Sequence, residues 1–126
     1  MVDEEEEKEK EEVIKCKVIL IGSSGVGKTS IILRFIKNIF KSDMVSSAGA
    51  SFYSKTLIMD DKNQSIKFEI WDTAGQEKFR SLNRAFYRKS NACILVYDIT
   101  KRSSFEDLKD FWINEIKENA PENISR

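Results

Sequence analysis

The 126-residue chain contains no histidine and only two cysteines. Without histidine, a histidine general base and a histidine-ligated zinc site are both excluded. Cys16 and Cys93 each lie within or beside an apolar, strand-like run, which is typical of buried thiols in a reducing compartment rather than of a disulfide. The sequence therefore excludes histidine-dependent catalysis and argues against a disulfide.

Long apolar runs are also absent. No stretch approaches the roughly 20 apolar residues that a membrane span needs, and the acidic N-terminus lacks the apolar core of a secretion signal. The sequence has neither the Met-Gly start of a myristoylation site nor a cysteine near its C-terminus for prenylation. We therefore expect a cytoplasmic, one-domain chain that cannot anchor itself in a membrane.

The formal net charge of zero hides an asymmetry along the chain. Residues 1–12 contain eight acids and two lysines, a local charge of −6, and the rest of the chain carries +6. We interpret residues 1–12 as a disordered acidic tail. The basic residues that follow are scattered among acids rather than interleaved with aromatic residues, so we do not expect nucleic-acid binding.

The pattern of apolar residues predicts an α/β domain. CKVILIG and NACILVYDIT are typical of strands covered on both faces, and SFYSKTLIM with SIKFEIWD predicts an antiparallel hairpin. Apolar residues after Lys28 recur at helical spacing, which predicts a first helix. A short irregular helix is expected before NACILVYDIT. Ser103 with Glu106 matches the capping box of a last helix. We predict three layers around a mostly parallel sheet with one antiparallel hairpin.

Residues 22–29, GSSGVGKT, match the phosphate-loop pattern G-x-x-x-x-G-K-[ST] between a strand and a helix. Backbone N–H groups of residues 24–29 can surround a polyphosphate, and the three glycines let the chain curl around it. We expect Lys28 to reach the β- and γ-phosphates and the Thr29 hydroxyl to bind Mg²⁺. The alternative is a glycine-containing turn with an incidental Lys-Thr. The predicted nucleotide-binding residues of the loop are Ser24, Gly25, Val26, Gly27, Lys28, Thr29 and Ser30.

A second glycine-bearing loop begins in WDTAGQEKF, at the end of another predicted strand. Asp72 suits a direct or outer-shell role at Mg²⁺, and Gly75 can offer its backbone N–H to a γ-phosphate. Gln76 can both donate to and accept from a water molecule, so it can orient a nucleophile without being a strong base. The alternative is that Asp72 caps a turn and Gln76 is a solvated loop residue.

In this order, GSSGVGKTS, WDTAGQEKF and LVYDIT resemble the Ras-like small GTPases, and RSLNRAFYR and SFEDLKDFW resemble the Rab family in particular. AGASF at residues 48–52 leans toward the early-endosome branch. The resemblance covers about residues 15–121 and implies a P-loop NTPase fold, with residues 13–126 as the N-terminal part of a small GTPase domain. It also implies GTP or GDP with Mg²⁺ as ligands.

The resemblance assigns roles to two residues between the phosphate loop and the hairpin. Phe40 lies where these proteins place an aromatic ring against the guanine edge. Ser47 takes the place of a threonine that ligates Mg²⁺ and touches the γ-phosphate, and Ala48 departs from the usual isoleucine after it. Serine keeps the ligand oxygen but loses a methyl group, so we expect the ordered triphosphate state to be less favoured.

Three aromatic residues, Phe52, Trp71 and Phe86, align with the cluster through which Rab proteins present their nucleotide state to effectors. Simple core packing is the alternative for all three. We expect partial surface exposure, because Trp71 alternates away from Ile70 along its strand.

Two features of the family pattern are missing. The N-K-x-D segment that reads guanine and the later S-A-K loop do not occur before the last residue, Arg126. Against the family pattern, the chain lacks the last two strands, the last two helices and a cysteine-ended, lipidated tail, which leaves the fourth strand without a neighbour. We therefore interpret it as a C-terminally truncated form, in which guanine specificity depends on the resemblance and Phe40.

The resemblance implies a GTP-hydrolysing molecular switch that regulates vesicle trafficking on the cytosolic face of endosomal or other vesicle membranes. Thr29, Ser47 and Asp72 would hold Mg²⁺, and Gln76 would orient the attacking water. No residue is recognisable as an internal arginine finger, so we expect slow hydrolysis, and an exchange factor, a GTPase-activating protein and effectors as partners. Two alternatives remain: a non-hydrolysing interaction module, such as a decoy, and a P-loop kinase or ATPase.

Overall fold

The computed structural model describes residues 12–37, 51–59, 63–73 and 84–125. The strands and helices of these residues follow one another in the order predicted from the sequence. The strands are β1 (Glu12–Ile21), β2 (Ser51–Met59), β3 (Gln64–Asp72) and β4 (Ala92–Leu95). The helices are α2 (Lys28–Lys37), α3 (Arg84–Tyr87), α4 (Arg102–Asp107), the π-helical segment η2 (Leu108–Trp112) and α5 (Ile113–Asn119). The first strand begins at Glu12, one residue before the predicted start of the domain.

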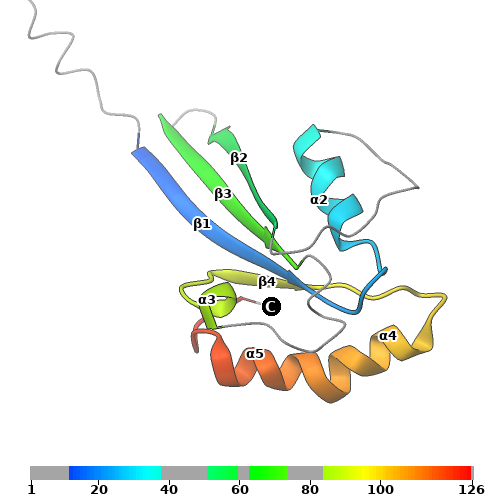
Figure 1. The fold of residues 1–126 in the computed structure, drawn as a ribbon. Helices are drawn as coiled ribbons and strands as arrows, with labels where there is room; N and C mark the ends of the chain where they lie inside the picture. The colour runs from blue at the N-terminus through cyan, green and yellow to red at the C-terminus, as the bar shows by residue number, and fades with distance from the viewer. Residues whose placement is uncertain (1–11, 38–50, 60–62, 74–83, 126) are drawn as a thin grey trace, which may run out of the picture.

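The four strands form one sheet in the order β2-β3-β1-β4 (Figure 1). β1 pairs in parallel with both β3 and β4, whereas β2 and β3 form the antiparallel hairpin predicted from the sequence. Parallel neighbours need a crossover connection, and helices supply it here. The prediction of a mostly parallel sheet with one antiparallel pair is confirmed.

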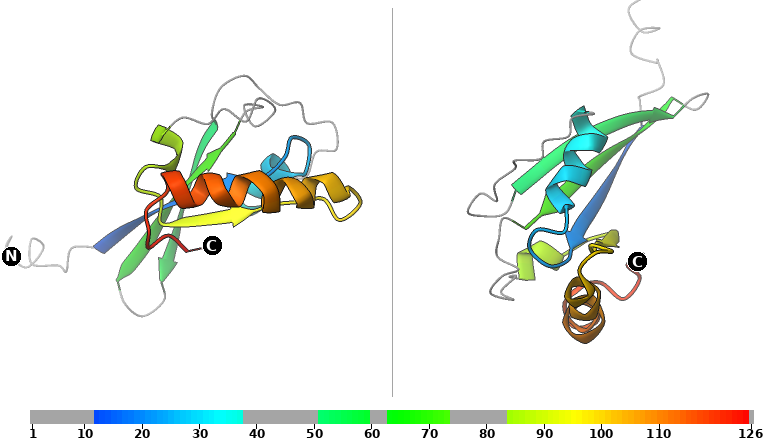
Figure 2. Two further views of the ribbon diagram at one scale, coloured as in Figure 1. Left: turned by 90° about the horizontal axis from the view of Figure 1, so that it is seen from below. Right: turned by 90° about the vertical axis from the view of Figure 1, so that its right-hand side faces the viewer.

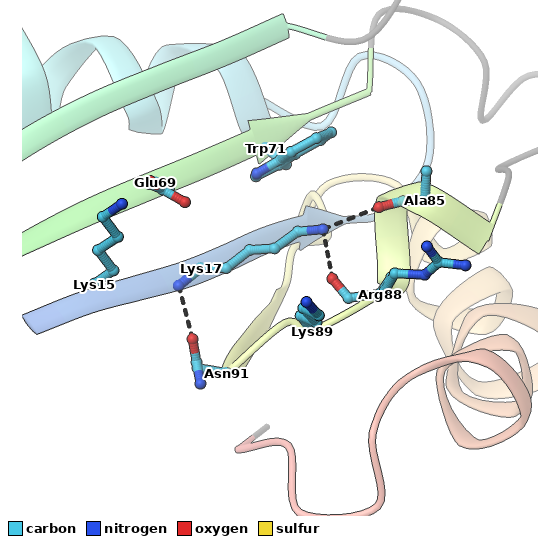
Figure 3. A pocket seen from close by; sticks show the side chains of 8 residues that line it. All are labelled: Lys15, Lys17, Glu69, Trp71, Ala85, Arg88, Lys89 and Asn91. Carbon is cyan, nitrogen blue, oxygen red and sulfur yellow. Dashed lines mark hydrogen bonds between the residues drawn. The ribbon is translucent and has the colours of Figure 1, made fainter.

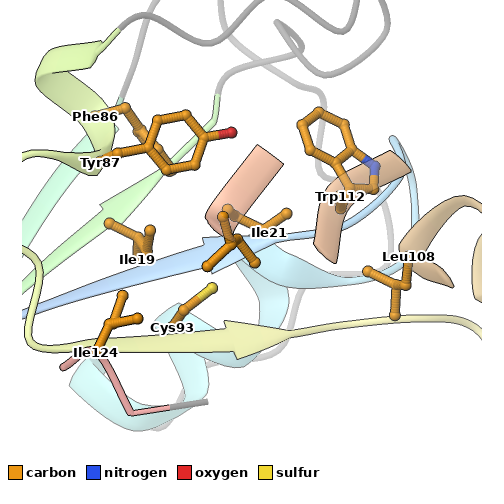
Figure 4. Packing of buried hydrophobic residues seen from close by; sticks show 9 residues of the cluster. Ile19, Ile21, Phe86, Tyr87, Cys93, Leu108, Trp112 and Ile124 are labelled. Carbon is orange, nitrogen blue, oxygen red and sulfur yellow. The ribbon is translucent and has the colours of Figure 1, made fainter. Parts of the chain in front are cut away.

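β1 contributes side chains to two separate cores, one on each face of the sheet. Ile19 and Ile21 are fully buried against Phe86, Tyr87 and residues of η2 and α5 (Figure 4). Val18 and Leu20 point to the opposite face, where Ile32 of α2 covers them. Figure 2 shows α2 and the α4–α5 rod on opposite sides of the sheet, which gives the three predicted layers.

The last helix begins without the predicted capping box. Its N-cap residue is Lys101, which makes no side-chain capping hydrogen bond. Ser104, not Ser103, closes the preceding turn: its Oγ donates to the Lys101 carbonyl at 2.7 Å and accepts from the Asp98 N–H at 2.9 Å. The helix therefore starts one residue earlier than Ser103, which takes that side chain out of the capping position.

The buried face of this helix follows a strict four-residue spacing, with Leu108, Trp112 and Ile116 in the core. Four-residue spacing drifts around a regular α-helix, which has 3.6 residues per turn. The wider π-helical turn of η2 offsets this drift and keeps the three side chains aligned. Phe105, three residues before Leu108, lies off this face: it is 44% exposed and packs against Tyr97, with ring centroids 5.3 Å apart.

The free edge of β4 is paired near its beginning. The Cys93 N–H donates to the Ser125 carbonyl at 2.8 Å, and the Ser125 N–H donates to the Asn91 carbonyl at 3.1 Å. The expectation of a fourth strand without a neighbour is therefore wrong at this position, although Ile94 is 45% exposed. Among the helices of the described residues, none has the length and apolar character needed to cross a membrane.

Candidate nucleotide-binding site

The loop of residues 22–27 leads from β1 into α2. Glycine is required in this loop for two different structural reasons. Gly25 and Gly27 have φ angles of +79° and +102°, which L-residues rarely adopt, and a Cβ built on either would meet no atom within 4 Å. Gly22 has no such angle, but a Cβ there would lie 2.2 Å from the Val96 carbonyl oxygen. The loop thus turns through two left-handed residues and leaves open space beside them.

Lys28 folds back over the start of this loop. The side chain is only 4% exposed, and its Nζ donates to the carbonyl oxygens of Gly22 at 2.9 Å and Ser23 at 2.8 Å. These partners are neutral dipoles, so the loop surrounds a largely desolvated positive charge. Such an arrangement attracts an anion at the first turn of α2.

Thr29 and Asp72 meet where the two predicted loops begin. The Thr29 Oγ1 donates to the Asp72 Oδ2 at 2.5 Å, and Asp72 is 1% exposed at the end of β3. One hydroxyl and one carboxylate oxygen are thereby held side by side next to the Lys28 loop. The structure brings together these predicted metal ligands from positions 43 residues apart.

This donor set fits Mg²⁺, which usually takes one or two carboxylates and completes its shell with phosphate and water oxygens. Across the described residues, no group of three or more His, Cys, Asp or Glu side chains is arranged to hold a metal ion. An all-protein cation cage is therefore not formed by these residues. Thr29 and Asp72 would hold the ion together with a phosphate group.

The remaining predicted loop residues occupy ordinary positions around this centre. Ser24 is half-buried, Ser30 lies in the first turn of α2, and Val26 packs against the core on the α2 side of the sheet. Val26 therefore fixes the loop through its side chain. Four further predicted site residues lie outside the described residues: Phe40, Ser47, Gly75 and Gln76.

A contact from α4 to the loop was missed at the level of the sequence. The Ser23 Oγ donates to the Asp107 Oδ2 at 2.7 Å across 84 residues of sequence. The Ser23 carbonyl in turn accepts from Lys28, so Asp107 is connected to the buried ammonium through one residue. No spacing signal in the sequence marks this pair.

The three aromatic residues form a ladder from the surface to the core. The rings of Phe52 and Trp71 have centroids 5.6 Å apart, and those of Trp71 and Phe86 lie 6.5 Å apart. Phe52 is 53% exposed and Trp71 is half-buried, as expected, but Phe86 is only 3% exposed. The expected exposure of Phe86 is wrong, because α3 directs this ring onto Tyr87 and the core.

Comparisons with known proteins agree with this geometry. The model of the Ras family matches residues 17–126. The GTP-binding protein ypt5 of Schizosaccharomyces pombe is 49% identical over 111 residues, which cover 88% of this chain and 52% of ypt5. The human Ras-related proteins Rab-31 and Rab-22A are 51% and 48% identical over 110 residues, 87% of this chain and 55% of each relative.

The chain thus spans about half the length of the curated relatives that it matches. The predicted resemblance to Rab proteins is confirmed by these relatives, and the phosphate-loop geometry is that expected of a P-loop domain. The chain belongs to the Ras family.

Proposed function

We propose that the protein is a GTP-binding and GTP-hydrolysing switch of the Rab type that regulates vesicle trafficking. The observation that carries the proposal is the apposition of Thr29 and Asp72 beside the Lys28 loop. The names of the relatives, a GTP-binding protein and two Rab proteins, support the choice of nucleotide and of branch. The proposal includes the early-endosome branch of Rab proteins, because the AGASF segment resembles that branch.

Phosphate binding is the task of the first loop. Backbone N–H groups of residues 24–29 face the polyphosphate, and Lys28 exchanges its neutral carbonyl partners for phosphate oxygens. Mg²⁺, when bound, neutralises charge on the β- and γ-phosphates. Thr29, Asp72 and Ser47 would hold the ion, and Phe40 would lie against the guanine edge.

Hydrolysis depends on Gln76, which would orient the attacking water without acting as a strong base. Lys28 and the loop amides would stabilise charge that develops between the β- and γ-phosphates. Ser47 and Gly75 would contact the γ-phosphate, so its loss would release the two loops that contain them, which we call the switch loops. Hydrolysis is expected to be slow alone, with an activating protein contributing on the order of 10³–10⁵ in rate.

Effectors would read the switch through the exposed edge of the aromatic ladder, Phe52 and Trp71, with Phe86 supporting the Trp71 ring from behind. An exchange factor and a GTPase-activating protein would act on the same switch loops. The site of action would be the cytosolic face of endosomal or other vesicle membranes.

A single-turnover assay of GTP hydrolysis with the full chain tests this function. Gln76→Leu should slow phosphate release while GTP binding persists, because only the water-orienting amide is lost. Gln64→Leu, the same substitution at the opposite end of β3, is the matched control and should leave hydrolysis unchanged. Equal loss of binding and hydrolysis in Gln76→Leu would refute the role of Gln76.

The same assay separates the alternatives. GTP binding without any phosphate release, or no binding at all, would favour an interaction module or decoy that keeps the Phe52–Trp71 surface. ATP that competes as well as GTP, with a phosphorylated acceptor, would favour a P-loop kinase or ATPase.

A further inference from the structure

An open groove of about 340 Å³ lies between β1, β3 and α3, away from the phosphate loop (Figure 3). Lys15 and Lys17 of β1 line one side of it, and Arg88 and Lys89 line the other. The ring of Trp71 forms a wall. Glu69 is the one acidic side chain among the residues that line this basic groove.

The charge of Lys17 is held in the groove by neutral partners. Its Nζ donates to the carbonyl oxygens of Ala85 at 3.0 Å and Arg88 at 2.7 Å, and lies 4.1 Å from the centroid of the Trp71 ring. Burial lowers the pKa of Lys17, the nearby Glu69 opposes this effect, and the positive charge of Arg88 adds to it. Carbonyl dipoles and an aromatic face leave the net positive charge of the groove uncompensated.

The other cations of the groove face solvent. Lys15, Arg88 and Lys89 are exposed, and none makes an ion pair with another side chain in the described part of the chain. Lys89 is also held in place by its backbone, which has a φ of +57° in a turn closed by the Ser90 N–H and the Tyr87 carbonyl. A ligand with several carboxylates would find these charges already placed.

The chain itself carries such a ligand next to the groove. Residues 1–11 contain seven acids and two lysines, a net charge of −5. They precede Glu12 directly, and Lys17 lies five residues further along β1, a distance of about 17 Å. Eleven residues span up to about 36 Å when extended, so this segment is long enough to double back. A short tether also gives it an effective concentration in the millimolar range.

We propose that the acidic segment of residues 1–11 binds in the basic groove of its own chain and covers the Trp71 ring. The proposed function has effectors bind at Trp71. On that function rests the further consequence that the acidic segment competes with effectors for the Trp71 ring. Such a contact is electrostatic and is weakened by salt.

Carbodiimide cross-linking of the full chain, followed by mass spectrometry, tests this contact. The reagent joins carboxylates to lysine amines that touch, so cross-links from Glu4–Glu7 to Lys89 are expected at 0.1 M NaCl. They should be lost at 1 M NaCl, where the screening length falls from about 10 Å to about 3 Å. Lys101 and Lys109, exposed lysines of the α4–η2 region, serve as internal references.

An equal mixture of ¹⁴N- and ¹⁵N-labelled chains shows whether the cross-link lies within one chain. Links that join differently labelled chains would assign the groove to a second copy and overturn the proposal. Links that reach Lys109 as often as Lys89, or no links from the acidic segment at all, would also overturn it.

Quenching of tryptophan fluorescence by acrylamide gives an independent reading, because Trp112 is 2% exposed and contributes a constant background. Lys89→Glu should raise the quenching of Trp71 to the level that the unmodified chain shows at 1 M NaCl. Lys109→Glu makes the same change in charge outside the groove and should leave quenching unchanged. Equal effects of the two substitutions, or no effect of Lys89→Glu, would contradict a segment that covers Trp71.

Discussion

At the scale of single residues, the Thr29 hydroxyl is oriented before any ligand binds. A hydroxyl has one proton to donate and two lone pairs that accept. The proton goes to the Asp72 Oδ2, so the lone pairs of Oγ1 are turned away from the carboxylate. The side chain is thus prepared to act as a ligand for a cation, which needs lone pairs and not protons.

The first prediction follows from this orientation. Thr29→Val keeps the size of the side chain but removes the ligand oxygen, so the gain in GDP affinity from Mg²⁺ should fall by about 10-fold or more, or about 1.4 kcal/mol. The affinity of Thr29→Val for GDP, measured in excess EDTA, should differ little from that of the unmodified chain. Thr56→Val, on the exposed face of β2, is the matched control. An unchanged Mg²⁺ effect in Thr29→Val would remove Thr29 from the metal site.

Tyr87 buries a hydroxyl in the core on the α3 side of the sheet. The residue is 1% exposed, and its OH has no hydrogen-bond partner among the described residues. Burial, with a smaller contribution from the carboxylate of Glu115, raises the pKa of Tyr87 above its ordinary value. Above pH 10 or so the unfolded chain ionises this hydroxyl while the folded chain does not.

The second prediction concerns stability at high pH. The unfolded chain binds fewer protons above about pH 10, so the free energy of unfolding should fall as the pH rises from there toward the raised pKa. Tyr87→Phe should reduce this fall and, at neutral pH, raise the free energy of unfolding by about 1 kcal/mol. Urea unfolding at neutral and alkaline pH measures both effects.

Tyr97→Phe, which changes a ring that is 45% exposed, is the control for this series and should leave the alkaline fall in place. A loss of stability in Tyr87→Phe at neutral pH would mean that the hydroxyl has a hydrogen-bond partner.

At the scale of secondary-structure elements, the phosphate loop is fastened to α4. Ser23 and Asp107 join the two through a 2.7 Å hydrogen bond, just before the π-helical segment begins. Hydrogen bonds to a charged acceptor stabilise more than neutral ones. The start of the loop, whose carbonyls hold Lys28, is therefore fixed by a helix that contributes no predicted ligand.

The third prediction is a coupling between these two elements. In a double-mutant cycle, Ser23→Ala, Asp107→Ala and the double variant each lower the free energy of unfolding. The sum of the two single losses should exceed the loss in the double variant by about 1 kcal/mol. Urea unfolding of the four chains gives the coupling. The cycle of Ser103→Ala with Asp107→Ala is the matched comparison, because Ser103 is an exposed serine of the same helix. Additive effects in the first cycle would show that the bond does not stabilise the fold.

Local sequence patterns predicted most of the elements but misjudged some side chains. The period of apolar residues gave the order of strands and helices, since alternation and helical spacing are local signals. The capping-box motif misplaced the start of the last helix, whose N-cap is Lys101 and not Ser103. The family resemblance, not the periodicity, led to the wrong expectation for Phe86, since the burial of a ring on a short helix depends on the sheet beneath it.

At the scale of the whole molecule, the predicted site forms where β1 and β3 end. These strands are parallel neighbours, so the loops that follow them lie at one edge of the sheet. That edge is where open α/β sheets bind ligands. The motifs predicted Lys28, Thr29 and Asp72 as one site, and the structure places Thr29 against Asp72 beside the Lys28 loop. Their role in binding a nucleotide stays a proposal.

Two other features of the molecule could not be read from the sequence. The Ser23–Asp107 bond and the basic groove both join residues that lie far apart along the chain. Neither Lys15 with Lys89 nor Ser23 with Asp107 has a spacing that marks it. Such pairs are created by the packing of α3 and α4 against the sheet, which no local pattern records.

The most direct test of the account is isothermal titration of the full chain with GDP in the presence of Mg²⁺. We predict binding at one site that weakens when EDTA removes the ion, and no comparable binding of ATP. The absence of detectable heat at high micromolar protein, or equal binding of ATP and GDP, would contradict the proposal that the Lys28 loop, Thr29 and Asp72 hold a guanine nucleotide.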